Sequence, residues 1–375
     1  MAPPPPPCRR RRRSPPALMD ELVEEILLRV PPDEPAHLVR AAAVCRPWRR
    51  IVSDRGFRRR YRELHRTPRL IGYFHNLDDN FAMRPTLVPT SPAYAFSRPA
   101  LAGRHSCAHD CRHGRVLIET FPQSSLVVWD PVTGDQQHLT VPAYQYSYST
   151  AAVLCAVDGC DHLDCHRGPF RVVFVGSYTD DYMGSVAWAS TYSSETGAWS
   201  ASTSVQIDYD QSIGLKPSLF IGDALYFTLQ YGVGILKYDL GKHELSEIDT
   251  PGISGAIIVK TEDRGLGFVC VLDNNIYLLS QQKGAIGIAG LGWVELKVIN
   301  LETLLPKVNL SSSLDLVGFA EGTDIVFINM GMGVFALDLK SQKVRRVGEY
   351  GPYYAILPYT STYIPDLPKG RLSLP

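Results

Sequence analysis

Residues 18–65 read LMDELVEEILLRVPPDEPAHLVRAAAVCRPWRRIVSDRGFRRRYRELH, and the interpretation of the whole chain begins with this segment. Leu18, Leu22 and Ile26 recur every four residues, which is the spacing of one face of an α-helix. Pro31 ends this helix, because proline cannot continue the helical hydrogen bonding. The apolar residues that follow predict two more short helices.

This segment holds more apolar side chains than three short helices can bury. It is about fifty residues long, and domains below about 60 residues are only marginally stable alone. The surplus of apolar side chains therefore predicts a surface that binds another protein. The alternative is a helical domain that packs against the rest of the same chain.

The segment also follows the residue order of a known family. Leu-x-x-Glu-Leu-x-x-Glu-Ile-Leu-x-Arg-Val-Pro is followed by Val-Cys-Arg-x-Trp-Arg and then by Ser-Asp-x-x-Phe. The matching positions are Leu18, Glu21, Leu22, Glu25, Ile26, Leu27, Arg29, Val30, Pro31, Val44, Cys45, Arg46, Trp48, Arg49, Ser53, Asp54 and Phe57. This pattern resembles the F-box family.

The resemblance implies a partner and a binding surface. An F-box docks the Skp-type adaptor of a cullin-based ubiquitin ligase. The residues that we expect to bind the adaptor are Leu18, Leu22, Ile26, Leu27, Pro31, Leu38, Val44, Cys45, Trp48 and Ile51.

From residue 67 onward, short β-branched or aromatic runs alternate with turn residues. One sequence pattern recurs roughly every 40–60 residues, a spacing typical of radial or stacked repeats. Each repeat consists of apolar strands, then a turn that begins at an aspartate such as Asp130 or Asp239, and then a polar outer strand. Because radial repetition protects strand edges, it predicts a β-propeller. We expect six blades, the sixth built from strands after Arg69 and near Tyr353; seven blades or a β-sandwich are alternatives.

The expected fold is therefore an α+β multidomain chain, in which small all-α F-box helices precede an all-β propeller. The expected regions are a disordered Pro/Arg-rich tail at 1–15, the F-box at 16–66, the propeller at 67–360 and a C-terminal tail at 361–375. This organisation resembles the plant F-box families that carry kelch-like or F-box-associated repeats.

Charge is distributed unevenly along the chain. Residues 1–70 hold 17 arginines and 8 acids, and the whole chain has 38 basic and 38 acidic residues, which leaves 21 basic and 30 acidic residues after residue 70. The run from Arg9 to Arg13 is either a nuclear import signal or a solvated tail. Neither a secretory signal nor a membrane span is predicted, so we expect a cytoplasmic or nuclear protein with reduced cysteines.

Two Cys/His clusters are the sharpest candidates for chemistry. The first is His105, Cys107, His109, Cys111 and His113, whose alternation would place all five on one face of a strand. The second is Cys155, Cys160, His162, Cys165 and His166. Zinc takes four such ligands, but neither cluster has a Cys-x-x-Cys pair. We expect reduced thiols and no metal; a metal-binding protein or a propeller-based enzyme is the alternative.

Tyrosines are the candidate residues for a second interface. They gather near residues 144–148, 178–192 and 350–354. Tyrosine is frequent at interfaces, because it buries a large area and keeps a hydroxyl group. If these residues lie on loops at one end of the propeller, they form a partner-binding face; otherwise many of them belong to the core.

Together these features predict a non-catalytic protein, the substrate-recognition subunit of a Skp–cullin–F-box ubiquitin ligase. The F-box would bind the adaptor and through it the cullin, and the propeller would hold an unknown target protein. We expect no cofactor, no catalytic residue, no nucleic-acid partner and no membrane partner.

Overall fold

The structure is a computed structural model in which the chain divides into two compact units, with a boundary after Arg66. The residues that it describes are 18–31, 36–65, 69–79, 82–89, 105–122, 124–162, 165–180, 184–208, 211–282, 288, 292–304 and 314–361. The expected tail at 1–15 lies outside these residues, as does the expected C-terminal tail beyond Ser361. The proposed domain boundaries remain predictions.

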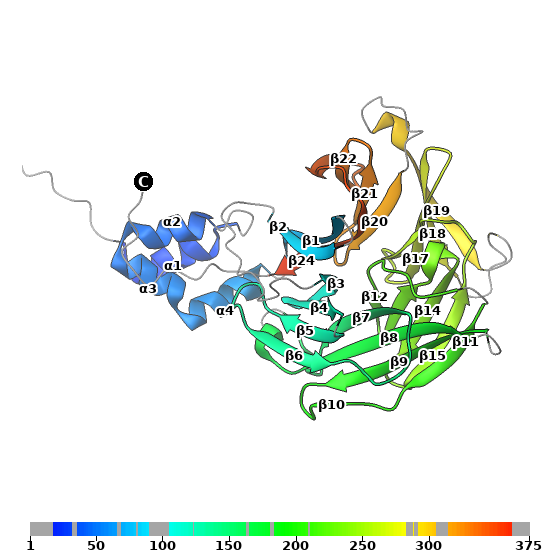
Figure 1. The fold of residues 1–375 in the computed structure, drawn as a ribbon. Coiled ribbons are helices and arrows are strands. Elements are labelled where there is room, and N and C mark those ends of the chain that lie inside the picture. Colours follow the sequence, from blue (N-terminus) through cyan, green and yellow to red (C-terminus); the bar gives the residue numbers. More distant parts are fainter. Residues whose placement is uncertain are drawn as a thin grey trace, which may run out of the picture. The chain divides into compact units, whose positions relative to one another are not determined.

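The first unit is built from short helices (Figure 1). They are α1 (Asp20–Leu28), α2 (Ala36–Val44), α3 (Arg46–Ser53) and α4 (Arg55–Leu64). Helix α1 ends shortly before Pro31, as predicted, and Pro47 lies in the first turn of α3, where a missing N–H group costs nothing. Within the described ranges, no helix has the length and hydrophobicity of a membrane span.

Helix α4 adds a fourth helix to the three that the apolar pattern predicted. It begins because the Asp54 side chain accepts hydrogen bonds from the backbone N–H groups of Gly56 and Phe57, at 2.8 and 3.1 Å. Arginines occupy much of α4, so its apolar periodicity rests mainly on Phe57 and Tyr61, both of which are buried. The capping aspartate was the signal that could have revealed this helix.

Helix α4 completes the core of the helical unit and is fastened to α1. Arg60 forms ion pairs with Glu24 and Glu25 at 2.8 and 2.7 Å, and the Tyr61 hydroxyl donates to the Val30 carbonyl at 2.8 Å. The buried core residues are Val23, Leu27, Leu28, Leu38, Ala42, Val52, Phe57 and Tyr61.

The second unit is a six-bladed β-propeller, as predicted (Figure 1). One sheet consists of β3 (His105–Arg112), β4 (Arg115–Phe121), β5 (Ser125–Trp129) and β6 (Gln136–Thr140). The next sheet along the chain consists of β7 (Tyr148–Cys155), β8 (Phe170–Asp180), β9 (Gly184–Ser193), β10 (Ala198–Trp199) and β11 (Thr203–Ile207). Each sheet is antiparallel, so a short turn can join neighbouring strands.

Three further sheets follow in chain order. They are β12 (Leu219–Ile221), β13 (Ala224–Thr228), β14 (Gly234–Asp239) and β15 (Glu244–Asp249); β16 (Ile257–Lys260), β17 (Leu266–Leu272), β18 (Asn275–Gln281) and β19 (Trp293–Asn300); and β20 (Asp315–Ala320), β21 (Ile325–Met330), β22 (Gly333–Asp338) and β23 (Val344–Gly348). Three short 3-10 helices, η1 (Cys165–Arg167), η2 (Gln230–Gly232) and η3 (Leu301–Thr303), lie between strands.

The two ends of the propeller segment meet in the sixth sheet. It consists of β2 (Ala82–Pro89), β1 (Arg69–Asp79) and β24 (Tyr353–Ser361), in that hydrogen-bonding order. Strand β1 pairs antiparallel with β24 from Arg69 to Leu77, which confirms the prediction that the last blade combines both ends. Pairing the two terminal segments covers one edge of β1 and one edge of β24 where the ring closes.

The aspartate turns predicted from the repeats occur in three sheets. Asp130, Asp239 and Asp338 each follow or end the third strand of a sheet. Each carboxylate accepts hydrogen bonds from two backbone N–H groups in the turn that follows, at 2.8–3.1 Å. A short local contact thus fixes the same hairpin in three blades.

Arg112, at the end of β3, holds distant parts of the propeller together. Its guanidinium contacts Asp110 at 2.5 Å, Glu321 at 2.6 Å and the Ser218 carbonyl at 2.6 Å. Asp110 also accepts from the Val153 N–H in β7 at 2.7 Å. Burial alone would lower the pKa of Arg112, but the carboxylates of Asp110 and Glu321 raise it, so the buried side chain stays cationic.

Candidate functional site

Helix α1 carries two apolar rows that face opposite environments. Val23 and Leu27 point into the core and are each 2% exposed. Leu18, Leu22 and Ile26 follow the four-residue spacing noted above, and they are 55%, 47% and 53% exposed. We call these three residues the α1 row. An exposed apolar row of this kind is typical of a surface that binds another protein.

The other predicted adaptor residues divide between surface and core. Pro31, Val44 and Cys45 are exposed, and Trp48 and Ile51 are half-buried. Leu27 and Leu38 lie in the helical core instead. These two residues hold α1 and α2 in place, so their part in adaptor binding would be indirect. The contacts of all ten residues with an adaptor remain a prediction.

The first Cys/His cluster does not form one face. A β-bulge between Ala108 and Asp110 interrupts the alternation of β3, and His113 lies beyond the strand in a turn, with a φ of 53°. His109 is buried and its Nε2 lies 2.7 Å from Glu119 Oε2. The prediction that all five side chains share a face is therefore wrong.

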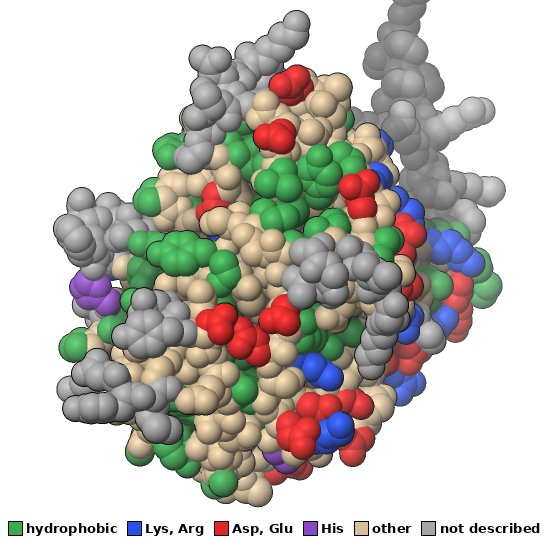
Figure 2. Space-filling model, turned by 90° about the vertical axis from the view of Figure 1, so that its right-hand side faces the viewer, with side chains coloured by type: hydrophobic (Ala, Val, Ile, Leu, Met, Phe, Trp, Pro, Cys, Tyr) green, Lys and Arg blue, Asp and Glu red, His purple; other side chains and the backbone are tan. Residues whose placement is uncertain are grey.

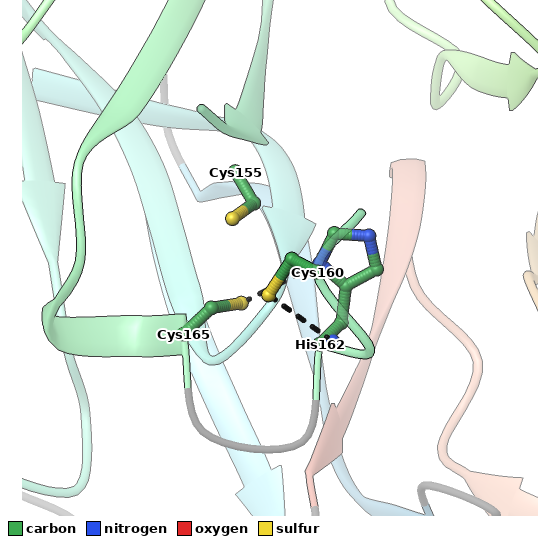
Figure 3. A group of neighbouring side chains, drawn as sticks. All are labelled: Cys155, Cys160, His162 and Cys165. Atoms are coloured by element: carbon green, nitrogen blue, oxygen red, sulfur yellow. Dashed lines mark hydrogen bonds between the residues drawn. The ribbon is translucent and has the colours of Figure 1, made fainter. Parts of the chain in front are cut away.

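The second cluster does come together, apart from one member. Suitable ligand atoms of Cys155, Cys160, His162 and Cys165 all lie within 4.8 Å of one another (Figure 3). His166 lies elsewhere, with its Nε2 3.9 Å from Asp130 Oδ2. These four residues could hold a metal ion.

The exposed tyrosines gather at one end of the propeller. In each sheet, the turn from the second to the third strand lies at the same end as the start of the first strand. We call this end the entry face. In the described part of the chain, five tyrosines are more than 40% exposed: Tyr144, Tyr148, Tyr231, Tyr350 and Tyr354. All five lie on connections or strand starts at the entry face. By contrast, Tyr192 is 8% exposed and belongs to the core.

Acidic side chains make up much of the charged surface on the face drawn in Figure 2. On the face in Figure 2 they lie as separate groups among hydrophobic and uncharged side chains. This distribution agrees with the excess of nine acidic residues after residue 70.

Glu119 is the most deeply buried carboxylate near the entry face. His109, Ser149 and Tyr146 lie within hydrogen-bond distance of it, at 2.7, 2.9 and 3.4 Å. Burial alone would raise the pKa of Glu119, but the hydrogen bond and charge of His109 and the two hydroxyl groups lower it overall. The folded protein therefore favours the ionised form.

We expect Glu119→Gln to reduce the acid sensitivity of the propeller. Because the folded pKa is below the ordinary value of 4.5, the unfolded state binds more protons as the pH falls. The stabilisation that ionised Glu119 contributes is complete above the ordinary pKa of 4.5, and it is lost as the pH falls through the lowered pKa of the folded protein. Urea unfolding should show that the variant is less stable at neutral pH and loses less stability between about pH 5 and about pH 3. An unchanged pH dependence would contradict this role.

The chain combines a unit of short helices with a β-propeller. Residues 18–60 match the F-box domain, and residues 107–365 match the family described as F-box protein AT5G49610-like, beta-propeller. The chain therefore belongs to this family of F-box proteins.

Solved structures resemble the propeller at low sequence identity. The extracellular domain of the putative one component system BT4673 from B. thetaiotaomicron is 14% identical over 69% of this chain, with a TM-score of 0.36; the chain spans 30% of that protein. A functionally unknown protein from Desulfotomaculum acetoxidans DSM 771 is 12% identical over 75% of this chain and 80% of its own, with a TM-score of 0.38. A luciferin-regenerating enzyme is 8% identical over 68% of this chain and 80% of its own, with a TM-score of 0.41. A comparison with curated proteins finds no match.

Proposed function

We propose that this chain is the substrate-recognition subunit of a Skp–cullin–F-box ubiquitin ligase. The observation that carries the proposal is the exposed α1 row, Leu18, Leu22 and Ile26, within a domain that matches the F-box. F-box domains generally bind Skp-type adaptors, and a partner helix or groove would remove this apolar row from water. The protein itself contributes no catalytic group in this function.

The propeller would hold the target protein on its entry face. Its exposed tyrosines supply large contact areas with hydroxyl groups at their tips. Catalysis by the assembled ligase would then depend on proximity, because binding raises the effective concentration of target lysines beside the ubiquitin-conjugating enzyme. Such a protein would act in the cytoplasm or nucleus.

A double variant of the entry face tests where the target binds. Tyr148 and Tyr231 are 48% and 72% exposed, so replacing both by serine removes contact area without opening the core. Proteins whose ubiquitylation depends on this chain should lose both co-purification and ubiquitylation in the double variant. We expect the loss in binding to be about tenfold or more, because interface tyrosines often contribute more than about 1 kcal/mol each.

Leu296→Ser is the matched control, because Leu296 is also exposed, at 48%, but lies on the outer strand β19. It should retain the same proteins. Retention of every target by the double tyrosine variant would place target recognition elsewhere, while adaptor binding would still test the F-box separately.

A further inference from the structure

The loop between β7 and β8 is much longer than its counterparts in the other blades. It spans residues 156–169, fourteen residues, whereas the same connection has two residues between β3 and β4, two between β12 and β13, five between β16 and β17 and four between β20 and β21. Among its described residues the regular structure is the single turn of η1, and long loops with so little regular structure need another source of order or have a function. This loop contains Cys160, His162 and Cys165 and begins directly after Cys155.

The spacing of these four side chains matches a tetrahedral metal centre. Around zinc, with Zn–S distances of about 2.3 Å, two thiolate sulfurs lie about 3.8 Å apart, and a sulfur and an imidazole nitrogen lie about 3.5 Å apart. Cys165 Sγ and His162 Nδ1 are 3.6 Å apart, and all four ligand atoms lie within 4.8 Å of one another. A small closing movement would place them around one ion.

Backbone N–H groups already point at two of the sulfurs. The Val157 N–H donates to Cys155 Sγ, and the His162 N–H donates to Cys160 Sγ, both at 3.4 Å. Such donors stabilise thiolate charge and orient a sulfur toward a metal. Figure 3 shows the cysteine sulfurs and the His162 ring gathered around one small region, with Cys165 supplied by η1.

Neighbouring residues hold the ligands in place from the adjacent blade. The buried Arg115 donates from Nη2 to the carbonyls of Cys165 and Gly168, at 2.7 and 2.6 Å. The His113 ring packs against the His162 ring, with centroids 4.0 Å apart. Three thiolates and one Zn²⁺ carry a net charge of −1, and the guanidinium of Arg115 supplies a positive charge beside them.

We propose that Cys155, Cys160, His162 and Cys165 bind one zinc ion that fastens the β7–β8 loop to the propeller. Zn²⁺ would replace three thiol protons, which leave to solvent, and would take a lone pair from the neutral imidazole. All four positions of the ion are then filled by protein, so the site is structural and leaves no position for a substrate. Three thiolates with one imidazole favour zinc over the harder Mg²⁺ and Ca²⁺ ions.

Metal analysis of the full chain tests this site. We expect the protein purified under reducing conditions to contain about one zinc per chain by plasma mass spectrometry. Cys160→Ser and His162→Gln should each reduce zinc to the level of a buffer blank. His166→Gln is the matched control, because His166 is adjacent to Cys165 in sequence and its ring lies beside Asp130; this variant should keep its zinc.

A spectroscopic measurement on the unaltered chain covers the case in which a ligand variant fails to fold. Cobalt exchanged into the site should give the visible bands of tetrahedral Co²⁺ and near-ultraviolet thiolate-to-cobalt charge transfer. The proposal is overturned by an unaltered chain that binds neither zinc nor cobalt, or by zinc retained in both ligand variants. A disulfide between any two of these cysteines, in protein alkylated at cell lysis, would also overturn it.

Discussion

Replacing Leu22 and Ile26 together by alanine is expected to weaken binding of a Skp-type adaptor by about 10- to 100-fold. Both side chains are about half exposed on α1, where a partner would bury them. Full burial of a Leu or Ile side chain contributes about 1.5–3 kcal/mol, and a partner would bury only the half that is still exposed, so loss of both side chains corresponds to about 1.5–3 kcal/mol. Isothermal titration calorimetry with purified adaptor measures the change directly.

Two single variants separate binding from folding. Leu27→Ala removes a core side chain and should cost about 2–5 kcal/mol of stability in the helical unit. Leu64→Ala removes an apolar side chain that is 60% exposed on α4, outside the α1 row, and should leave adaptor binding unchanged. If the Leu22/Ile26 variant keeps the affinity of the unaltered protein, α1 does not supply the adaptor surface.

Arg112→Met is expected to destabilise the propeller by about 3–5 kcal/mol, because it leaves the buried carboxylate of Asp110 and the half-buried carboxylate of Glu321 without their cation. Asp110 is 3% exposed and loses the ion pair that compensates its burial. Glu321 loses two hydrogen bonds from the guanidinium. Thermal and urea unfolding of the propeller should both show the loss.

The control is Arg346→Met. Arg346 pairs with Glu349 on the surface, with side-chain exposures of 51% and 83%, and exposed pairs contribute about 0–1 kcal/mol. Adding Asp110→Asn to Arg112→Met should recover part of the stability, since it removes the unpaired charge. Equal stability of the Arg112 and Arg346 variants would show that the buried network does not hold the sheets together.

Local patterns explain why much of the fold could be predicted. A carboxylate that accepts two N–H groups in its own turn acts over three residues, so Asp130, Asp239 and Asp338 identify their hairpins without tertiary information. The pairing of β1 with β24 was predictable for a different reason: a ring of sheets must cover its terminal strand edges.

Other features depended on contacts between residues far apart in the sequence. The spacing of α1 predicts two apolar rows, but only packing against the other helices decides that Leu27 is buried and Leu22 exposed. Likewise, alternation along β3 suggested a shared face, and a bulge in its pairing with β4 removed it. A bulge depends on the partner strand and therefore leaves little trace in one strand alone.

Repeated turns, helix spacing and the order of F-box residues are local properties, and they specified a short helical module followed by a β-propeller. The exposure of the α1 row, the gathering of tyrosines on the entry face and the Arg112 network were decided by tertiary structure, because each depends on how separate elements pack. The Cys/His residues illustrate the difference. Both clusters combine cysteine and histidine, and four side chains of the second come together around the β7–β8 loop, while a bulge interrupts the alternation of the first in β3.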